Sequence, residues 1–486
     1  MKRKALNKQI ISLAVLLVAA AALGIVVFAL SREGGGSPEP ESVSVPAVDE
    51  TVYIIQGTIN ALTIQNEHGE FTVRRGEGDE FRIPALERFP QDTAALSSLL
   101  YRLSHLRSQG TLEGIQNLAP FGLSTPRAVI TVELEDGERR FLAIGAEAPD
   151  GRNIYVSSGE SDGNTGGEAR EVQLADSYDL SNCFRRDLDF LNLAVTPASG
   201  GDGQTLEFER IELGGLVRGK EPVTIVYSPL DETSTVPGIR NPYRITSPLE
   251  INLSLDRGIQ PLQALFGLTA DSVAAVLETP ASRTRYGLDK PYSIARVRGA
   301  ESFSLIASAP DDTGRVYLTL EGRDIVYTAA VSKLPWLDRT FFDLMDRLVV
   351  IPFIDRIAEA EVIDHERGSV FSFALSGEGD DLVVRSDNAV IDTAQFRAFY
   401  QTLLTAMYDE YYDGVLPAGA APLAEILYRY RDGSPPDRVS FYPGSSRRVL
   451  TVFNGGRPFY THRTYVDKLL KDCTEIREGK KVLPYL

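Results

Sequence analysis

The chain has 486 residues, of which 50 are Lys or Arg and 67 are Asp or Glu, so its net charge at pH 7 is −17. One hydrophobic core rarely serves so long a chain, and the length therefore indicates several domains. A surface this acidic repels the phosphates of nucleic acids, and we expect no nucleic-acid partner.

The first element in chain order is an uncharged run of 21 residues, 10–30, with the sequence IISLAVLLVAAAALGIVVFAL. As a helix it would be roughly 30 Å long, which matches the hydrocarbon core of a bilayer. The preceding tail, 1–9, carries four basic residues and no acid. Basic flanks stay in the cytoplasm, so we predict a single-pass transmembrane anchor with a cytoplasmic tail and an extracytoplasmic body.

A cleaved signal peptide is the alternative for this run. Signal peptides have apolar regions of about 7–15 residues that end in small side chains, whereas this run is longer and ends in Val27-Phe28-Ala29-Leu30. The sequence therefore favours an uncleaved anchor. Residues 31–50 are rich in Gly, Pro, Ser and Glu, which predicts a flexible linker. Beyond residue 32 the chain holds 45 basic and 67 acidic side chains, a charge of about −22.

Two segments that lie 300 residues apart match as amphipathic helices. Asp92 and Asp392 each stand where a helix N-cap is expected, and apolar residues follow at helical spacing. A hairpin is predicted before each helix, at 58–73 and at 356–373, because apolar and polar residues alternate around a polar turn. The matching apolar positions are Leu96, Leu99, Leu100 and Leu103 in one helix and Phe396, Phe399, Tyr400 and Leu403 in the other.

The phrase Gly-Leu-x-x-Pro occurs in FGLSTP (121–126) and in YGLDKP (286–291), and a looser form occurs at 417–422. Each copy leads into paired strands, and we expect its Gly and Pro to shape a tight turn. A tyrosine-bearing strand follows each copy, at Tyr155, Tyr317 and Tyr460. A closing helical segment is then expected, for example at 330–348, which contains Trp336, Phe341 and Phe342.

This repetition predicts three tandem, related α+β modules after the transmembrane helix, at 51–195, 206–350 and 354–482, the last being divergent. In each module we expect an antiparallel sheet with helices packed on one face.

The anchor, the repeated phrase and the run IGAEAPDGRNIY (144–155) resemble a bacterial family of membrane-anchored proteins of unknown function, DUF4340. The resemblance covers most of 51–350 and weakens toward the C-terminus, where 417–422 departs from the phrase. Members of that family are large exported proteins that are often encoded beside ABC transporters of the gliding-motility auxiliary type. The resemblance implies a bacterial origin and a role with such a transporter, and it supplies no catalytic residues.

Motifs of catalysis are scarce in this sequence. Residues 214–220 fit the spacing of a phosphate loop, but Glu221 replaces the Ser or Thr that holds magnesium and a strand-like run follows, so no nucleotide is expected. The four histidines form no close pair with another His or with Cys, which gives no predicted metal site. Cys183 and Cys473 leave open either a disulfide or two buried thiols. We predict no catalytic residue and no cofactor.

The segment 407–413, MYDEYYD, interleaves aromatic and acidic residues. On a helix, Tyr408 and Tyr411 share a face with the core positions, which favours core packing. The outward side chains could instead stack on a sugar or a peptide, so Tyr408, Tyr411 and Tyr412 form the candidate binding patch.

These features favour a non-enzymatic, membrane-anchored extracytoplasmic scaffold, an accessory protein of an ABC-type transport or gliding-type system with membrane or envelope protein partners. The alternative is an extracytoplasmic module that binds cell-envelope glycan or peptide. An envelope hydrolase with dispersed acids is the third reading, and a buried carboxylate pair in a cleft would support it.

Overall fold

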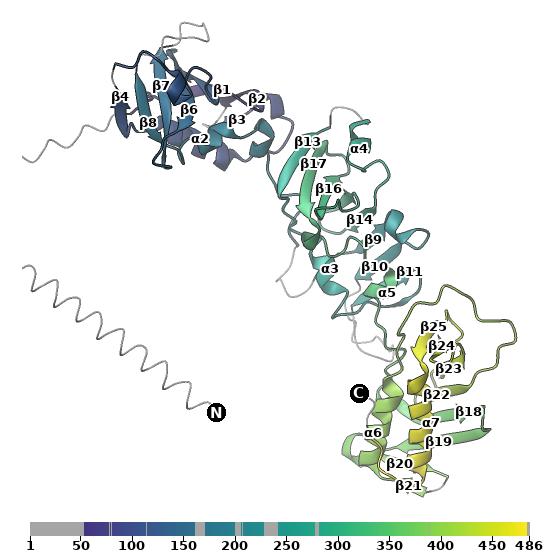
Figure 1. Cartoon of the computed structure of the whole chain (residues 1–486). Helices are drawn as coiled ribbons and strands as arrows, with labels where there is room; N and C mark the ends of the chain where they lie inside the picture. Colours follow the sequence, from purple (N-terminus) through teal and green to yellow (C-terminus); the bar gives the residue numbers. More distant parts are fainter. Residues whose placement is uncertain are drawn as a thin grey trace, which may run out of the picture.

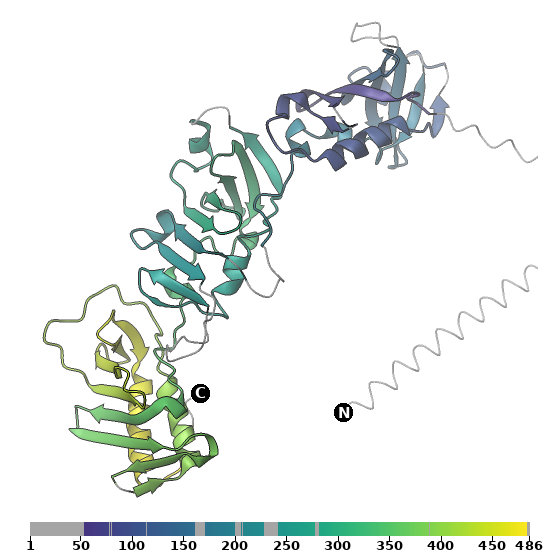
Figure 2. The same cartoon turned by 180° about the vertical axis from the view of Figure 1, so that it is seen from behind.

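The computed structural model describes residues 53–483, except for 77, 79, 113, 161–170, 200–205, 207, 228–241, 278–280 and 388. The predicted tail, anchor and linker lie outside the described residues. Within the described part, no helix has the length and apolar character that a membrane crossing requires. Three antiparallel sheets follow one another along a bent row (Figure 1), and the view from behind shows the same order (Figure 2). We call each sheet with its helices a module.

In the first module, the predicted helix and hairpin are confirmed. The side chain of Asp92 accepts a hydrogen bond from the backbone N–H of Ala95, and the leucines of the predicted apolar face are buried. Alternate side chains of the strand 128–134 are buried, and the strand 59–66 buries Ile59, Ala61, Leu62 and Ile64. The elements are β1 (Ile59–Asn66), β2 (Gly69–Arg75), β3 (Phe81–Arg82), α2 (Thr93–Ser104), β4 (Gly110–Leu112), β5 (Ala128–Leu134), β6 (Arg139–Glu147), β7 (Asn153–Glu160) and β8 (Val172–Asp176).

The second module is almost entirely β-structure, and its helices have only four or five residues each. The prediction of a helical segment over 330–348 is wrong, because Pro335 interrupts it and only two short turns form, at 331–333 and 341–344. The elements are β9 (Arg210–Gly214), β10 (Val223–Tyr227), β11 (Tyr243–Ser247), β12 (Ile251–Asn252), α3 (Ile259–Gln263), β13 (Ser272–Val276), α4 (Ala281–Arg285), β14 (Ser293–Arg298), β15 (Phe303–Ala307), β16 (Arg315–Leu320), β17 (Ile325–Ala330) and α5 (Phe341–Leu344).

The third module has the predicted hairpin, the predicted helix and a second long helix. Asp392 caps the first helix through the N–H of Gln395. The two helices pack against each other in front of the sheet (Figure 1). The elements are β18 (Ile357–Asp364), β19 (Ser369–Ser376), β20 (Val383–Ser386), β21 (Ala389–Ile391), α6 (Thr393–Leu404), β22 (Ala424–Tyr430), β23 (Asp437–Pro443), β24 (Arg448–Phe453), β25 (Phe459–His462) and α7 (Arg463–Arg477).

The strand orders show one shared plan. Each sheet joins a hairpin, extended to three strands in the first sheet and to four in the other two, to a four-stranded meander. The joining pairs are β1–β5, β9–β14 and β18–β22. A short strand, β4 or β13, closes the far edge of the first two sheets, whereas a single bridge between Glu410 and Tyr460 stands there in the third. The prediction of three related antiparallel sheets is therefore confirmed, while the layer of long helices is limited to the outer two modules.

The phrase Gly-Leu-x-x-Pro forms a helix-ending turn in both of its copies. Gly122 and Gly287 have φ values of 69° and 67°, which suit glycine. The aromatic residue before each glycine contacts the tyrosine of the third meander strand, with ring centroids 4.9 Å apart for Phe121 and Tyr155. Tyr286 and Tyr317 repeat that contact at 5.1 Å. The predicted third tyrosine, Tyr460, lies one strand further along, on β25, which is the fourth strand of its meander.

Candidate functional site: the junctions between modules

The segments that connect the modules are bonded to both neighbours. The first linker pairs Leu191 with Gln91, just before α2, and then pairs Ala194 with Thr269 of the second module. We call 191–195 and 345–349 the straps. In the second strap, Met345 pairs with Leu253 before α3, and Leu348 pairs with Met407 after α6. The two junctions thus have the same backbone connections.

Side chains within the straps repeat as well. The amide oxygen of Asn192 accepts from the N–H of Ala194 at 2.8 Å, and the carboxylate of Asp346 accepts from the N–H of Leu348 at 3.1 Å. The chain enters the first module by the same route, because Tyr53 pairs with Arg107 after α2. In all three modules the incoming chain therefore pairs with a residue that follows a helix. In the first two modules the outgoing chain pairs with a residue that precedes that helix.

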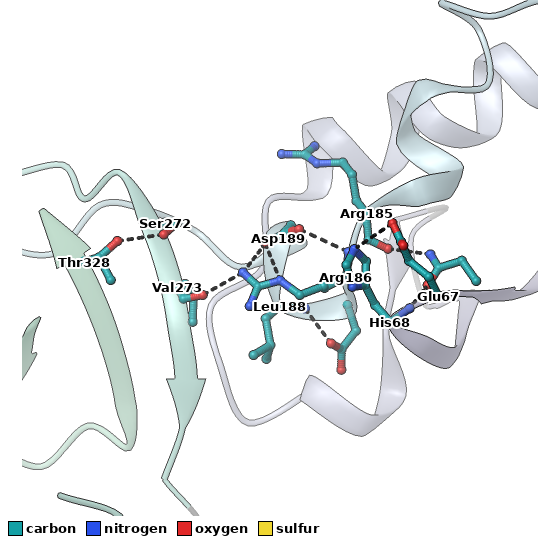
Figure 3. A network of polar contacts seen from close by, with 11 residues as sticks. Glu67, His68, Arg185, Arg186, Leu188, Asp189, Ser272, Val273 and Thr328 are labelled. Atoms are coloured by element: carbon teal, nitrogen blue, oxygen red, sulfur yellow. Dashed lines mark hydrogen bonds and ion pairs between the residues drawn. The ribbon is translucent and has the colours of Figure 1, made fainter. Parts of the chain in front are cut away.

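A polar network braces the first junction (Figure 3). The guanidinium of Arg186 donates to the carboxylate of Asp189 at 2.6 Å and to the carbonyl oxygen of Val273, on β13 of the second module, at 2.9 Å. Burial would raise the pKa of Asp189, but the hydrogen bonds from Arg186 outweigh it and lower that pKa. Within the second module, the hydroxyl of Ser272 on β13 lies 2.7 Å from that of Thr328 on β17. The ionised pair thus holds the first module to the edge strand of the second.

The second junction is braced by a three-residue cluster, which we call the clamp. Glu221 follows the turn between β9 and β10, whereas Tyr411 and Arg457 belong to the third module. The hydroxyl of Tyr411 donates to the Glu221 carboxylate at 3.0 Å, and Arg457 donates to it at 2.9 Å. Arg457 also donates to the Tyr411 hydroxyl and lies over its ring, 4.6 Å from the centroid.

Aromatic side chains of the second module pack against Tyr411 of the clamp and against its neighbour Phe459. Phe341, on α5, meets the ring of Tyr411 edge-on at 5.7 Å. Phe342 stacks on Phe459 of the third module, with ring centroids 6.0 Å apart. A charged hydrogen-bonded cluster backed by buried rings is well suited to fix two modules in one orientation.

The predicted tyrosine patch lies at this junction. The helical setting assumed for it is wrong, because α6 ends at Leu404 and the tyrosines follow in an irregular segment along β25. Tyr408 is only 4% exposed, and burial raises its pKa. Tyr411 belongs to the clamp, and Tyr412 meets the ring of Tyr460 edge-on at 5.1 Å. Tyr408 and Tyr411 both contact the ring of Phe459, with centroids 4.4 Å and 6.4 Å away, whereas Tyr412 contacts Tyr460 instead.

A cleft of about 380 Å³ lies beside the clamp, between the second and third modules. Its apolar walls include Leu348 and Val350 of the strap region and Phe453 of the third module. Arg244 and Arg457 line it, and each is paired with a carboxylate, Glu250 and Glu221 respectively. The cleft thus combines apolar walls with neutralised charges.

Glu221, Phe341 and Arg457 were not identified from the sequence as a group. Glu221 stood out only as the residue that disqualifies a phosphate loop, and 214–220 is indeed the turn of an antiparallel pair, β9 and β10. Cys183 and Cys473 are buried free thiols in different modules. Within the residues that the structure describes, no group of three or more His, Cys, Asp or Glu side chains is arranged to hold a metal ion.

A buried carboxylate occurs on β22, where the side chain of Glu425 is 8% exposed. It accepts hydrogen bonds from Ser440 at 2.7 Å and from Arg438 at 3.2 Å, and the Nε2 atom of His365 lies 3.0 Å away. Burial would raise the pKa of Glu425, but these partners outweigh it and lower that pKa below the ordinary 4.5.

This carboxylate gives the third module an acid-sensitive stability. A folded-state pKa below 4.5 means that the stabilisation is complete above pH 4.5 and is lost as the pH falls through the folded value. Glu425→Gln should cost about 1–3 kcal/mol at pH 7, because Arg438 loses its charged acceptor, and should flatten the decline in stability below pH 4.5. Urea unfolding followed by circular dichroism from pH 7 to pH 3 measures both effects.

Glu410→Gln is the matched control, since Glu410 is half exposed and pairs with Arg448 on the surface. It should keep the acid-dependent decline of the unsubstituted chain. An equal flattening in both variants would contradict the assignment to Glu425.

The profile of one protein family matches the chain, and its description is "Domain of unknown function (DUF4340)". The match covers residues 82–165 and 244–423, which include strands of all three sheets. Comparisons with curated proteins and with solved structures give no match. Since the matched residues make up more than half of the 486, the chain belongs to the DUF4340 family.

Proposed function

We propose that the protein is a non-enzymatic, membrane-anchored extracytoplasmic scaffold, an accessory component of an ABC-type transport or gliding-type system. One observation supports this proposal above others: both junctions repeat the same strap and add a side-chain brace. Modules joined in this way form a stiff row that can present a long surface to partner proteins. Residues 10–30 would hold the row at the membrane, and 31–50 would tether it.

The alternative function, binding of an envelope peptide or glycan, is favoured by the cleft beside the clamp. A cleft of about 380 Å³ falls within the size range of small-ligand pockets, and Tyr408 and Phe453 supply aromatic wall. Calorimetric titration of the chain with envelope peptides and muropeptides tests this alternative. Phe453→Ser should abolish any binding that occurs in this cleft.

Stiffness of the row is the physical requirement of the scaffold. Arg457→Met removes the guanidinium that joins Glu221 and Tyr411. Because these groups are partly exposed, we expect a loss of about 1 kcal/mol, roughly a fivefold gain in open arrangements of the second and third modules. Electron-spin distance measurements between labels at Glu321 and Asp380, one in each module, should show a broader distribution.

Arg448→Met is the matched control, because Arg448 pairs with Glu410 inside the third module. Its distance distribution should equal that of the unsubstituted chain. An unchanged distribution in Arg457→Met would show that the clamp does not set the orientation.

Partner capture tests the biological side of the proposal. The full chain, crosslinked in its own membranes and affinity-purified, should bring down an integral membrane subunit of a transporter, and less of it in Arg457→Met. Recovery of the chain without any membrane or envelope protein would refute the accessory role.

A further inference from the structure

The first module carries exposed aromatic and basic side chains at the end where the chain enters it. Tyr101 and Tyr178 are 65% and 67% exposed, which places them among the most exposed large apolar side chains of the described part. His105 and Arg107 are exposed beside them. We call this group the tether-side patch, and its members are Tyr53, Tyr101, Arg102, His105, Arg107 and Tyr178.

Contacts within the patch keep its rings ordered. Tyr101 stacks on His105 with ring centroids 4.2 Å apart, and His105 meets the ring of Tyr53 edge-on at 6.1 Å. Arg107 lies over the ring of Tyr53, 5.7 Å from its centroid. Arg102 likewise lies 4.1 Å from the centroid of Tyr178 and pairs with Asp179 at 3.2 Å. The patch therefore presents aromatic faces and cations together with two acids: Asp179, which pairs with Arg102, and Asp176, which accepts a hydrogen bond from the backbone N–H of Tyr178 at 2.9 Å.

The other two modules lack such a patch at the equivalent place. The bridges that receive the incoming chain align Arg107 with Thr269 and with Met407. Tyr101 and His105 stand six and two residues before Arg107. The residues six and two positions before Thr269 and Met407 are uncharged and non-aromatic in both later modules. The equivalent sets are Gln263, Gly267 and Thr269 in the second module and Gln401, Thr405 and Met407 in the third.

We propose that the tether-side patch rests in the headgroup layer of the bilayer and is attracted there by anionic phospholipid. This inference rests on the membrane anchor of the proposed function. The chain runs from Tyr53 back to the predicted anchor at 10–30 through the linker 31–50. A flexible linker of about 20 residues has an end-to-end distance of roughly 25 Å, which keeps this end of the first module near the bilayer.

The chemistry of the patch suits that position. Tyrosine is enriched at the level of the headgroups, where its ring is half apolar and its hydroxyl is hydrated. Arginine is attracted to anionic lipid within about a Debye length of the surface. The body as a whole carries about −22 and is repelled by the same surface. An end that carries exposed tyrosines and two arginines, on an acidic body, therefore orients the row with the first module toward the membrane and the third away from it.

The test uses the full chain reconstituted in vesicles of seven parts phosphatidylcholine and three parts phosphatidylglycerol, with a nitroxide quencher on the headgroups. A fluorophore is attached at Gln109→Cys, an exposed position beside the patch, or at Val415→Cys in the third module, which is 84% exposed. The native thiols are buried and escape labelling. We expect at least twofold stronger quenching at position 109 than at 415, and weaker quenching at 109 in pure phosphatidylcholine.

The variant Tyr101→Ser/Arg107→Gln/Tyr178→Ser should lower the quenching at position 109 to the level found at 415. Arg385→Gln/Val390→Ser removes a similar exposed pair from the third module and should leave it unchanged. Circular dichroism confirms that both variants are folded.

Several outcomes would overturn the proposal. Vesicle-bound chain with equal quenching at 109 and 415, or with quenching insensitive to the triple variant, leaves the anchor in place but removes the patch from the headgroups. Quenching that appears only when other membrane proteins are added identifies a protein occupant instead. Chain that washes off the vesicles in alkaline carbonate refutes the anchor itself, and with it the proposed function.

Discussion

Replacing Arg218 with Met should destabilise the second module by about 3–5 kcal/mol, the largest single-residue effect that we expect in this protein. Arg218 is only 6% exposed, and no carboxylate is among the hydrogen-bond partners of its guanidinium. Its guanidinium donates to the carbonyl oxygens of Trp336, Leu337 and Arg339 and of Gly214, and to the hydroxyl of Ser293.

Burial lowers the pKa of Arg218 to about 10, although the negative charge of Asp338 acts in the opposite direction, so the group stays protonated at pH 7. It therefore ties the turn after β9 to the segment that closes the module. Without it, several buried carbonyl groups lose their donor, and each unsatisfied group costs about 1–3 kcal/mol. Trp336 is the single tryptophan and is fully buried in this module, so its fluorescence during urea unfolding reports the loss directly.

Two further variants show whether the loss of stability comes from the buried hydrogen bonds of Arg218. Arg210→Met removes an exposed arginine of β9 that pairs with Glu212, and it should change stability by less than about 0.5 kcal/mol. Arg218→Lys keeps the charge but reaches fewer acceptors, so its loss should fall between the other two. An Arg218→Met chain as stable as the Arg210→Met chain would show that the carbonyl groups find other donors.

Gly145→Ala should destabilise the first module by about 3 kcal/mol, because its β-carbon would stand 2.2 Å from the carbonyl oxygen of Phe121. That oxygen belongs to the turn at Gly122 and cannot move without displacing the ring that covers Tyr155. Urea unfolding followed by circular dichroism should show the loss, while the fluorescence of Trp336 keeps its midpoint.

Gly110→Ala, on β4 of the same module, is the control. A β-carbon there meets only Leu174, at 3.8 Å, which is ordinary contact, so stability should stay within about 0.5 kcal/mol. Equal effects of the two alanines would mean that loss of glycine flexibility, and not the close approach of Phe121, decides the outcome.

Local patterns in the sequence were enough to predict much of this fold. The caps at Asp92 and Asp392 and the alternation in the hairpins depend on neighbours within a few residues, and both were found correctly. The closing segment of the second module misled the prediction, because Trp336 and Phe341 mark burial in either a helix or an irregular segment. Tyr408 and Tyr411 misled it similarly, since their spacing suits a helix but α6 ends before them.

The clamp could not be predicted because its parts are far apart in the chain. Glu221 and Arg457 are separated by 236 positions, and neither belongs to a motif. Arg457 follows two glycines in a turn, a setting that normally predicts exposure. The straps were not predicted for a related reason. Their residues form isolated backbone bridges to two different modules, and such bridges produce no periodic pattern of apolar residues in the sequence.

The straps also determine how the protein would carry a mechanical load. In the first two modules, the incoming chain is bonded just after a helix and the outgoing chain just before it, at Arg107 and Gln91 in one case and at Thr269 and Leu253 in the other. Tension between a membrane and a distant partner would therefore pass from strap to strap along the helix side of each module. The ladders of the sheets would bear load only after these bridges had parted, so a pulled chain would lengthen at its junctions first and keep its sheets folded.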